Sequence, residues 1–144
     1  MVVITLPAFN EAETLPLLLE AIQQSMLENG IEYRVIVVDD GSVDATAEIT
    51  RRLSQTMPIS LVQHEENRGL GEAIRTGLFA ATEDADPRDI IVTMDADETH
   101  TPTLIPTPNE RIPADILDIR AFWPEPSQPP PWVQGLKVTG FTAK

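Results

Sequence analysis

The sequence lacks cysteine and is poor in basic residues, and each shortage excludes a class of protein. Without cysteine the chain has no disulfide, no thiolate metal site and no cysteine nucleophile. Ten Lys and Arg stand against 23 Asp and Glu, which gives a net charge of −13. A field of that sign repels nucleic acid and anionic lipid surfaces. We therefore expect no nucleic-acid partner.

Long hydrophobic runs are missing as well. No stretch approaches the roughly 18 consecutive apolar residues of a membrane-spanning helix, and the amino end lacks a basic flank followed by an apolar run. The expected location is the cytoplasm. With 144 residues, 42% of them hydrophobic, the chain has the size and composition of a single domain with one core.

Proline and charge divide the chain near residue 102. Nine of the 13 prolines lie from Pro102 onward, a density that interrupts helices and inner strands. Acidic and basic residues cancel in 103–144, so the whole net charge lies in 1–102. We expect a folded part over residues 1–104 and a proline-rich irregular tail over residues 105–144.

Before Pro102, short runs that are apolar on both faces alternate with amphipathic stretches. The apolar runs lie at 2–6, 35–38 and 90–94, with a weaker one at 59–64, and strands covered by helices on two sides have this pattern. Apolar residues recur at helical spacing in 11–29, 45–55 and 71–82. The alternation predicts an α/β fold, with three layers (α/β/α) around a mainly parallel sheet.

Residues typical of helix ends flank two of the expected helices. Asn10 with Glu13 resembles a capping box at the start of the first helix, and Gly30 suits its carboxyl end. Ser42 or Asp44 would cap the second helix.

Acidic residues follow three of the predicted strands, at Glu11, at the pair Asp39 and Asp40, and from Asp95 onward. Open parallel sheets bind ligands at this edge. Carboxylates gathered there repel one another unless a cation or hydrogen-bond donors compensate. Asp95 and Asp97 can project to one side, and their hard oxygen atoms suit Mg²⁺ or Mn²⁺. This pattern predicts a metal site for a phosphate-bearing substrate.

Other polar positions near this edge have a structural interpretation of equal weight. Asp39 by itself and Asp44 are as readily turn or cap residues as ligands. Two glycines in the turn at 67–71 permit close backbone approach, and Arg68 could face a phosphate, although such a turn often merely starts a helix. The spacing fits neither a dinucleotide fingerprint nor a P-loop. Each of the two histidines, at 64 and 100, is more readily structural than catalytic.

Four stretches in order resemble the family 2 inverting glycosyltransferases of GT-A fold, in particular polyprenyl-phosphate sugar transferases such as dolichyl-phosphate mannose synthase. They are LPAFNEAETL, VIVVDDGSVDAT, ENRGLGEAIRTGL and IIVTMDADETHTP. The resemblance covers about residues 2–105, which correspond to the nucleotide-sugar-binding half of such a domain.

The resemblance implies roles for individual residues. The family motifs, with the arginine of the 67–71 turn, place these residues against the nucleotide sugar: Pro7, Phe9, Glu11, Val38, Asp40, Arg68, Asp95 and Ala96. The implied metal ligands are Asp95, Asp97 and Thr99. Phe9 stands where the family often has Tyr, and Thr99 where the mannose synthases often have Gln.

The implied reaction displaces the nucleotide from the anomeric carbon of a GDP- or UDP-sugar, with inversion, by an oxygen of a polyprenyl phosphate at the membrane surface. Mg²⁺ or Mn²⁺ bridging the diphosphate would stabilise the leaving nucleotide. A phosphate acceptor is already ionised and needs little base help, and the sequence identifies no catalytic base.

The family pattern ends after Pro106. A stretch around Arg120 resembles a degraded strand that would make Arg120 a diphosphate contact, but the helix expected before it is missing. The loss of pattern predicts a truncated or out-of-frame carboxyl end, and an exposed sheet edge would then favour a homodimer. The alternative function is a non-catalytic nucleotide-binding remnant of such an enzyme.

Two other classes fit less well. Asp95, Asp97 and Thr99 copy the nucleophile motif of haloacid-dehalogenase-like phosphatases, but here the motif follows the fourth strand, and only Lys137 and Lys144 come after it. A receiver-like domain needs a lysine at a strand end, and residues 1–104 contain no lysine.

Overall fold

The structure is a computed structural model, and it describes residues 1–83, 85–86, 89–96 and 137–140. Its centre is a sheet in which every pair of neighbouring strands is parallel, in the order β3-β2-β1-β4-β5. The strands are β1 (Val2–Ala8), β2 (Tyr33–Asp39), β3 (Ile59–Gln63), β4 (Ile90–Thr93) and β5 (Lys137–Gly140). The helices are α1 (Leu15–Glu28), α2 (Thr46–Leu53) and α3 (Leu70–Thr82).

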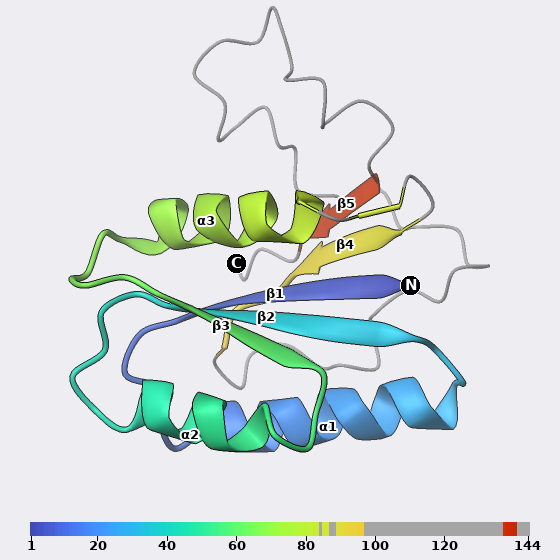
Figure 1. Ribbon diagram of the computed structural model, residues 1–144, viewed down its shortest axis with the longest axis horizontal. Coiled ribbons are helices and arrows are strands. Elements are labelled where there is room, and N and C mark those ends of the chain that lie inside the picture. The colour runs from blue at the N-terminus through green and yellow to red at the C-terminus, as the bar shows by residue number, and fades with distance from the viewer. Residues whose placement is uncertain (84, 87–88, 97–136, 141–144) are drawn as a thin grey trace, which may run out of the picture.

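Helices cover both faces of the sheet, with α1 and α2 on one side and α3 on the other (Figure 1). Successive strand residues point to opposite faces, so each strand supplies two cores. One core packs Val2, Ile4 and Leu6 against α1, and the other packs Val3 and its neighbours against α3. The prediction of a three-layer α/β fold around a mainly parallel sheet is confirmed.

Helix α3 lies very close to the sheet because Gly77 has no side chain. A Cβ atom there would stand 3.1 Å from Cβ of Thr5 and 3.3 Å from Cγ2 of Val38. The close approach brings the first turn of α3 next to the carboxyl ends of β1 and β2, where the functional cleft described below opens.

The start of α1 differs from the prediction. The helix begins at Leu15, and its N-cap residue Thr14 makes no side-chain capping bond. Asn10 does not cap it, because its backbone is left-handed (φ +56°) and its side-chain oxygen accepts a hydrogen bond from the amide of Val43, at 2.9 Å. The capping box expected from Asn10 and Glu13 is therefore wrong.

The predictions for the carboxyl end of α1 and the amino end of α2 agree with the structure in part. Gly30 adopts φ +63°, and its amide and that of Ile31 bond back to carbonyl groups of the last turn of α1, as a glycine carboxyl cap does. The N-cap residue of α2 is Ala45, which makes no side-chain capping bond, so neither Ser42 nor Asp44 occupies the cap position that was predicted for them. The side chain of Asp44 does accept a hydrogen bond from the amide of Thr46, at 3.0 Å. Ser42 instead binds the preceding loop, through a bond from the amide of Asn10.

Residues Lys137–Gly140 form β5, parallel to β4. The expectation of irregular structure over 105–144 is wrong for these four residues, because the last proline is Pro131 and nothing in Lys137–Gly140 removes a backbone donor. The division into parts at 104 and 105 stays a prediction. Within the described residues, no helix has the length and apolar character needed to cross a membrane.

Candidate functional site

A cleft of about 320 Å³ opens at the carboxyl ends of β1, β2 and β4, beside the first turns of α3. It is lined by residues from all four of these elements or the loops that adjoin them. They are Pro7, Ala8, Phe9, Glu11, Asp40, Asn67, Leu70, Ala73, Asp95 and Ala96. The cleft therefore lies where the parallel topology predicts a ligand site.

Six of the residues that the sequence analysis placed against a ligand line this one cleft. They are Pro7, Phe9, Glu11, Asp40, Asp95 and Ala96. The side chain of Phe9 is 44% exposed, so part of its ring is open to solvent. Segments that lie far apart in the chain thus supply one continuous wall.

Two predicted residues do not line the cleft. Val38 is 0% exposed and packs under α3 in the second core, because it lies one residue before the end of β2 and points to the α3 face. The side chain of Arg68 is exposed and is absent from the cleft wall. The predicted residues Asp97, Thr99, His100 and Arg120 lie outside the described residues.

The loop after β1 is bound to the loop after β2 by side chains of the second motif. The amide of Asn10 donates to Oγ of Ser42 at 2.9 Å, and that of Glu11 donates to Oγ1 of Thr46 at 2.9 Å. The amide of Ala12 donates to Asp44 at 3.1 Å. Short polar side chains at these spacings thus fix the cleft residues of the first loop.

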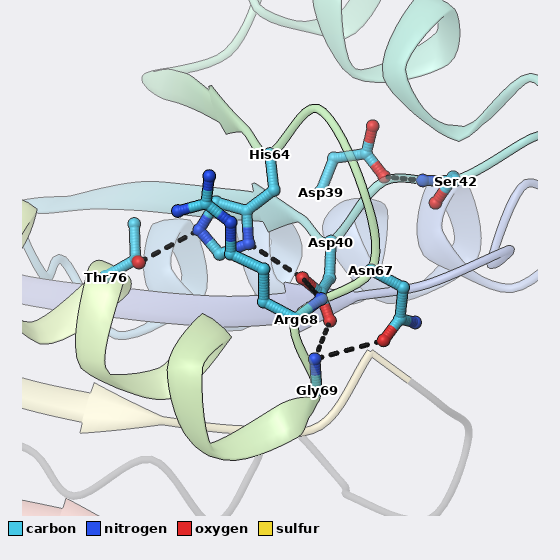
Figure 2. A network of polar contacts seen from close by, with 8 residues as sticks. All are labelled: Asp39, Asp40, Ser42, His64, Asn67, Arg68, Gly69 and Thr76. Atoms are coloured by element: carbon cyan, nitrogen blue, oxygen red, sulfur yellow. Dashed lines mark hydrogen bonds and ion pairs between the residues drawn. The ribbon is translucent and has the colours of Figure 1, made fainter.

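Asp40 is held by three donors from the segment that follows β3 (Figure 2). Its Oδ1 accepts from the amide of Arg68 at 2.9 Å and lies 2.7 Å from Nδ1 of His64, and its Oδ2 accepts from the amide of Gly69 at 2.8 Å. Burial raises the pKa of Asp40, but these hydrogen bonds outweigh burial and hold the pKa below its ordinary value. The carboxylate is therefore negatively charged and bound from within the protein.

The same bonds change the interpretation of the turn at 67–71. The amides of Arg68 and Gly69 bind the carboxylate of Asp40, so these two donors are not directed at a phosphate. Gly69 is required because it adopts φ +90° with ψ 159° at the start of α3, a conformation that is essentially restricted to glycine. The glycine-rich turn serves the internal carboxylate.

Hydrogen-bond donors also compensate the other acidic groups of this edge. Asp39 is fully buried and is bound by the amide of Ser42 at 3.0 Å; it does not line the cleft. The hydroxyl of Thr14 donates to Glu11. Burial raises the pKa of Asp44, but bonds from Thr46 and Ala12 outweigh burial and lower the pKa to below its ordinary value. Hydrogen-bond donors thus bind the carboxylates of Glu11, Asp40 and Asp44 and one oxygen of Asp39, while the second oxygen of Asp39 is buried without a hydrogen-bond partner among the described residues.

A metal site is not complete within the described part of the chain. No three His, Cys, Asp or Glu side chains of that part lie together in a way that could hold an ion. Asp95 follows β4 and lines the cleft, so it brings one hard oxygen ligand of the kind that Mg²⁺ and Mn²⁺ prefer. The other two predicted ligands, Asp97 and Thr99, are outside the described residues.

Four residues of the cleft wall were not predicted, namely Ala8, Asn67, Leu70 and Ala73. Ala8 lies between the predicted residues Pro7 and Phe9. For the other three the signal was present, because the third motif holds a turn that starts a helix. Which side chain of that turn faces the cleft depends on the conformation of Gly69 and on the bonds to Asp40, and neither is readable from spacing.

The chain is similar in sequence to known sugar transferases. The family model for glycosyl transferase family 2 matches residues 3–114. A dolichol-phosphate mannosyltransferase of Pyrococcus furiosus is 34% identical over 103 residues, which are 72% of this chain and 27% of the relative. An undecaprenyl-phosphate 4-deoxy-4-formamido-L-arabinose transferase of Photorhabdus laumondii is 35% identical over 105 residues, 72% of this chain and 31% of that relative. The chain thus spans less than a third of these relatives.

Solved structures agree on the fold. The mannosyltransferase PcManGT from Pyrobaculum calidifontis, in complex with GDP-Man and Mn²⁺, matches with a TM-score of 0.56 and 30% identity, over 67% of this chain and 27% of that one. S. aureus TarS in complex with UDP-GlcNAc matches with a TM-score of 0.54 and 22% identity, over 67% of this chain and 26% of that one. The second likeness concerns the fold alone.

Proposed function

The chain belongs to glycosyl transferase family 2, and from this premise we propose that its cleft binds a nucleotide diphosphate sugar for inverting transfer to a polyprenyl phosphate. One observation carries the proposal: residues of all four family-like stretches line a single cleft at the carboxyl edge of the sheet. Both curated relatives are polyprenyl-phosphate sugar transferases, and PcManGT binds GDP-Man.

The wall of the cleft divides into an apolar part and an acidic part. Pro7, Phe9 and Leu70 offer apolar surface, and the half-exposed ring of Phe9 can contact the face of a base or a sugar. Glu11, Asp40 and Asp95 add three carboxyl groups to the wall, and no described residue of the wall is basic. A cation that accompanies the diphosphate fits such a wall.

We assign the metal to Asp95 together with Asp97, and the metal is Mg²⁺ or Mn²⁺. The oxygen of Asp95 fits either ion, and the complex of PcManGT contains Mn²⁺. When bound, the ion would neutralise charge on the diphosphate and so stabilise the leaving nucleotide. Asp95 would thus act on the nucleotide sugar, through the metal. The acceptor phosphate is already ionised, so the chain need not remove a proton from it.

Calorimetry on the whole chain tests the proposal. GDP- and UDP-sugars should bind in the presence of Mn²⁺ or Mg²⁺, and affinity should fall by about tenfold or more in excess chelator, because the diphosphate then faces three carboxylates without a cation. Equal affinity with and without chelator would show that nucleotide-sugar binding needs no metal. If neither the GDP-sugars nor the UDP-sugars bind, the proposal is wrong.

Transfer is measured separately, with the nucleotide sugar and a polyprenyl phosphate in detergent. Turnover would establish the complete reaction for this chain. Binding without turnover would instead support the alternative of a nucleotide-binding chain that does not catalyse transfer.

Asn67→Asp is expected to weaken nucleotide-sugar binding by about tenfold. The side-chain oxygen of Asn67 accepts a bond from the amide of Gly69 at 3.0 Å, so its NH₂ group is the end that can donate to a ligand in the cleft. Aspartate keeps an acceptor for Gly69, removes that donor and adds a negative charge facing the diphosphate. Calorimetry measures the affinity, and a melting curve checks the fold.

Gln55→Glu is the matched control, because it adds the same charge at an exposed position outside the cleft wall. It should leave affinity unchanged. If Asn67→Asp binds as tightly as this control does, Asn67 does not contact the ligand.

A further inference from the structure

His64 links the end of β3 to the end of β2 and to α3. It follows β3, is only 6% exposed, and its amide donates to the carbonyl group of Asp39 at 2.9 Å. Its Nδ1 lies 2.7 Å from Asp40, and its Nε2 lies 3.0 Å from Oγ1 of Thr76 on α3 (Figure 2). Both ring nitrogens therefore have partners, one after β2 and one on α3.

We infer that His64 and Thr76 are positioning residues of the nucleotide-sugar cleft, acting through Asp40 on the turn that starts α3. The inference rests on the proposed function, since it names what keeps that site in its binding conformation. Neither His64 nor Thr76 lines the cleft, so neither contacts a ligand there. His64 acts on Asp40, which lines the cleft, and Thr76 acts through His64.

The chain of contacts leads to the cleft wall in two steps. His64 fixes the carboxylate of Asp40, which is acceptor-only and so requires the hydrogen on Nδ1. Asp40 then holds the amides of Arg68 and Gly69. The residues on either side of these amides, Asn67 and Leu70, are part of the wall. A rotated carboxylate would release the turn and move both wall residues.

Thr76 completes the arrangement by holding the far side of the imidazole ring. The hydroxyl of Thr76 is the partner of Nε2 in either charge state of the ring, because it can donate to the lone pair of the neutral ring or accept from the N–H of the charged ring. Thr76 lies in the middle of α3, so the ring is fixed to the helix that follows the two amides bound by Asp40. An apolar residue at position 76 would remove the hydrogen-bond partner that holds Nε2 in this part-buried position.

The interpretation as core packing alone predicts something different. If His64 only filled space, a phenylalanine of similar size would keep the cleft intact. If His64 positions Asp40, His64→Phe disturbs the turn, while His64→Asn restores it in part, because the asparagine NH₂ takes the place of Nδ1 beside Asp40. At position 76, Thr76→Ser keeps the hydroxyl, and Thr76→Val keeps the shape without it.

The experiment measures amide hydrogen exchange and calorimetric affinity for GDP- and UDP-sugars with Mn²⁺, on the whole chain and these four variants. In His64→Phe, exchange of the Arg68 and Gly69 amides should quicken by about tenfold and affinity should fall by a similar factor. Exchange of the Val37 amide in β2 reports that the sheet remains folded. Thr76→Ser should lie near the unsubstituted chain, His64→Asn between the unsubstituted chain and His64→Phe, and Thr76→Val near His64→Phe.

Several results would overturn the inference. One is unchanged exchange at Arg68 and Gly69 in His64→Phe, and another is faster exchange with unchanged affinity. If His64→Phe fails to fold, the two variants at position 76 provide the test. Equal affinity of Thr76→Val and Thr76→Ser for the nucleotide sugar would then contradict the inference. Absence of nucleotide-sugar binding by the unsubstituted chain would instead overturn the proposed function, and the inference with it.

Discussion

Replacing Gly41 by alanine should lower the melting temperature by roughly 10 °C or more. Gly41 has φ +71°, and a Cβ atom there would lie 2.4 Å from the carbonyl carbon of Glu66 and 2.6 Å from the amide nitrogen of Asn67. The left-handed conformation costs about 1–2 kcal/mol for alanine. Forcing the backbone of 66–67 away adds about 1–3 kcal/mol. That movement also pulls the neighbouring amides away from Asp40, so binding at the cleft should be lost with stability.

Two other glycines separate these costs. Gly30 has φ +63°, but a Cβ atom there would have no neighbour within 4 Å, so Gly30→Ala should cost only the conformational part, about 1 kcal/mol. Gly71 has neither a positive φ nor a close neighbour, and Gly71→Ala should be neutral or slightly stabilising. Thermal melts of the three variants compare them directly. If Gly41→Ala melts no lower than Gly30→Ala, the close approach of 66–67 carries no energetic weight.

Asp40→Asn should destabilise the chain by about 2–3 kcal/mol at neutral pH while leaving the volume of the side chain almost unchanged. The carboxylate accepts from three donors, whereas asparagine offers one oxygen and turns an NH₂ group toward a donor. Urea unfolding at pH 7 measures the loss. Glu65→Gln, at an exposed position next to His64, is the control that removes one charge without removing these bonds. Equal stability of the two variants would show that the bonds to Asp40 contribute nothing.

The same variant should also alter the acid response. The pKa of Asp40 in the folded chain lies below its ordinary value of 3.8, so the ionised form is favoured by folding. Its contribution to stability is complete above pH 3.8 and is lost as the pH falls through the lower, folded pKa. Urea midpoints measured from pH 6 downward should therefore fall less steeply in Asp40→Asn. Asp44, whose pKa is also lowered, contributes in the same direction and should remain in the variant.

The architecture could be predicted because local patterns determine it. The apolar runs at 2–6, 35–38 and 90–94 lie within or beside β1, β2 and β4, since only strands buried on both faces read that way. The start of α1 could not be predicted in this way. The side chain of Asn10 binds the amide of Val43 and that of Thr14 binds Glu11, so neither makes a capping bond to the helix. The groups that compete for a capping side chain are brought close only by the tertiary fold, so a sequence pattern does not predict them.

The cleft was predicted in part for a similar reason. Strand ends bring Glu11, Asp40 and Asp95 together by topology alone. The place of Val38 follows from the alternation of side chains, which puts it on the α3 face two residues before Asp40 and beneath the helix. The partners of Asp40 lie 24 to 29 residues further along the chain, and no short-range pattern announces them.

The bonds from Asp40 to the start of α3 have an electrostatic consequence. The aligned peptide units of a helix place partial positive charge at its amino terminus, and that charge usually attracts an anionic ligand. Here a built-in anion already occupies the position. The charge of Asp40, bound at the two amides that precede α3, thus offsets part of the positive charge at this helix end before any substrate arrives, and a bare diphosphate should gain less from the helix end than one already paired with its counterion.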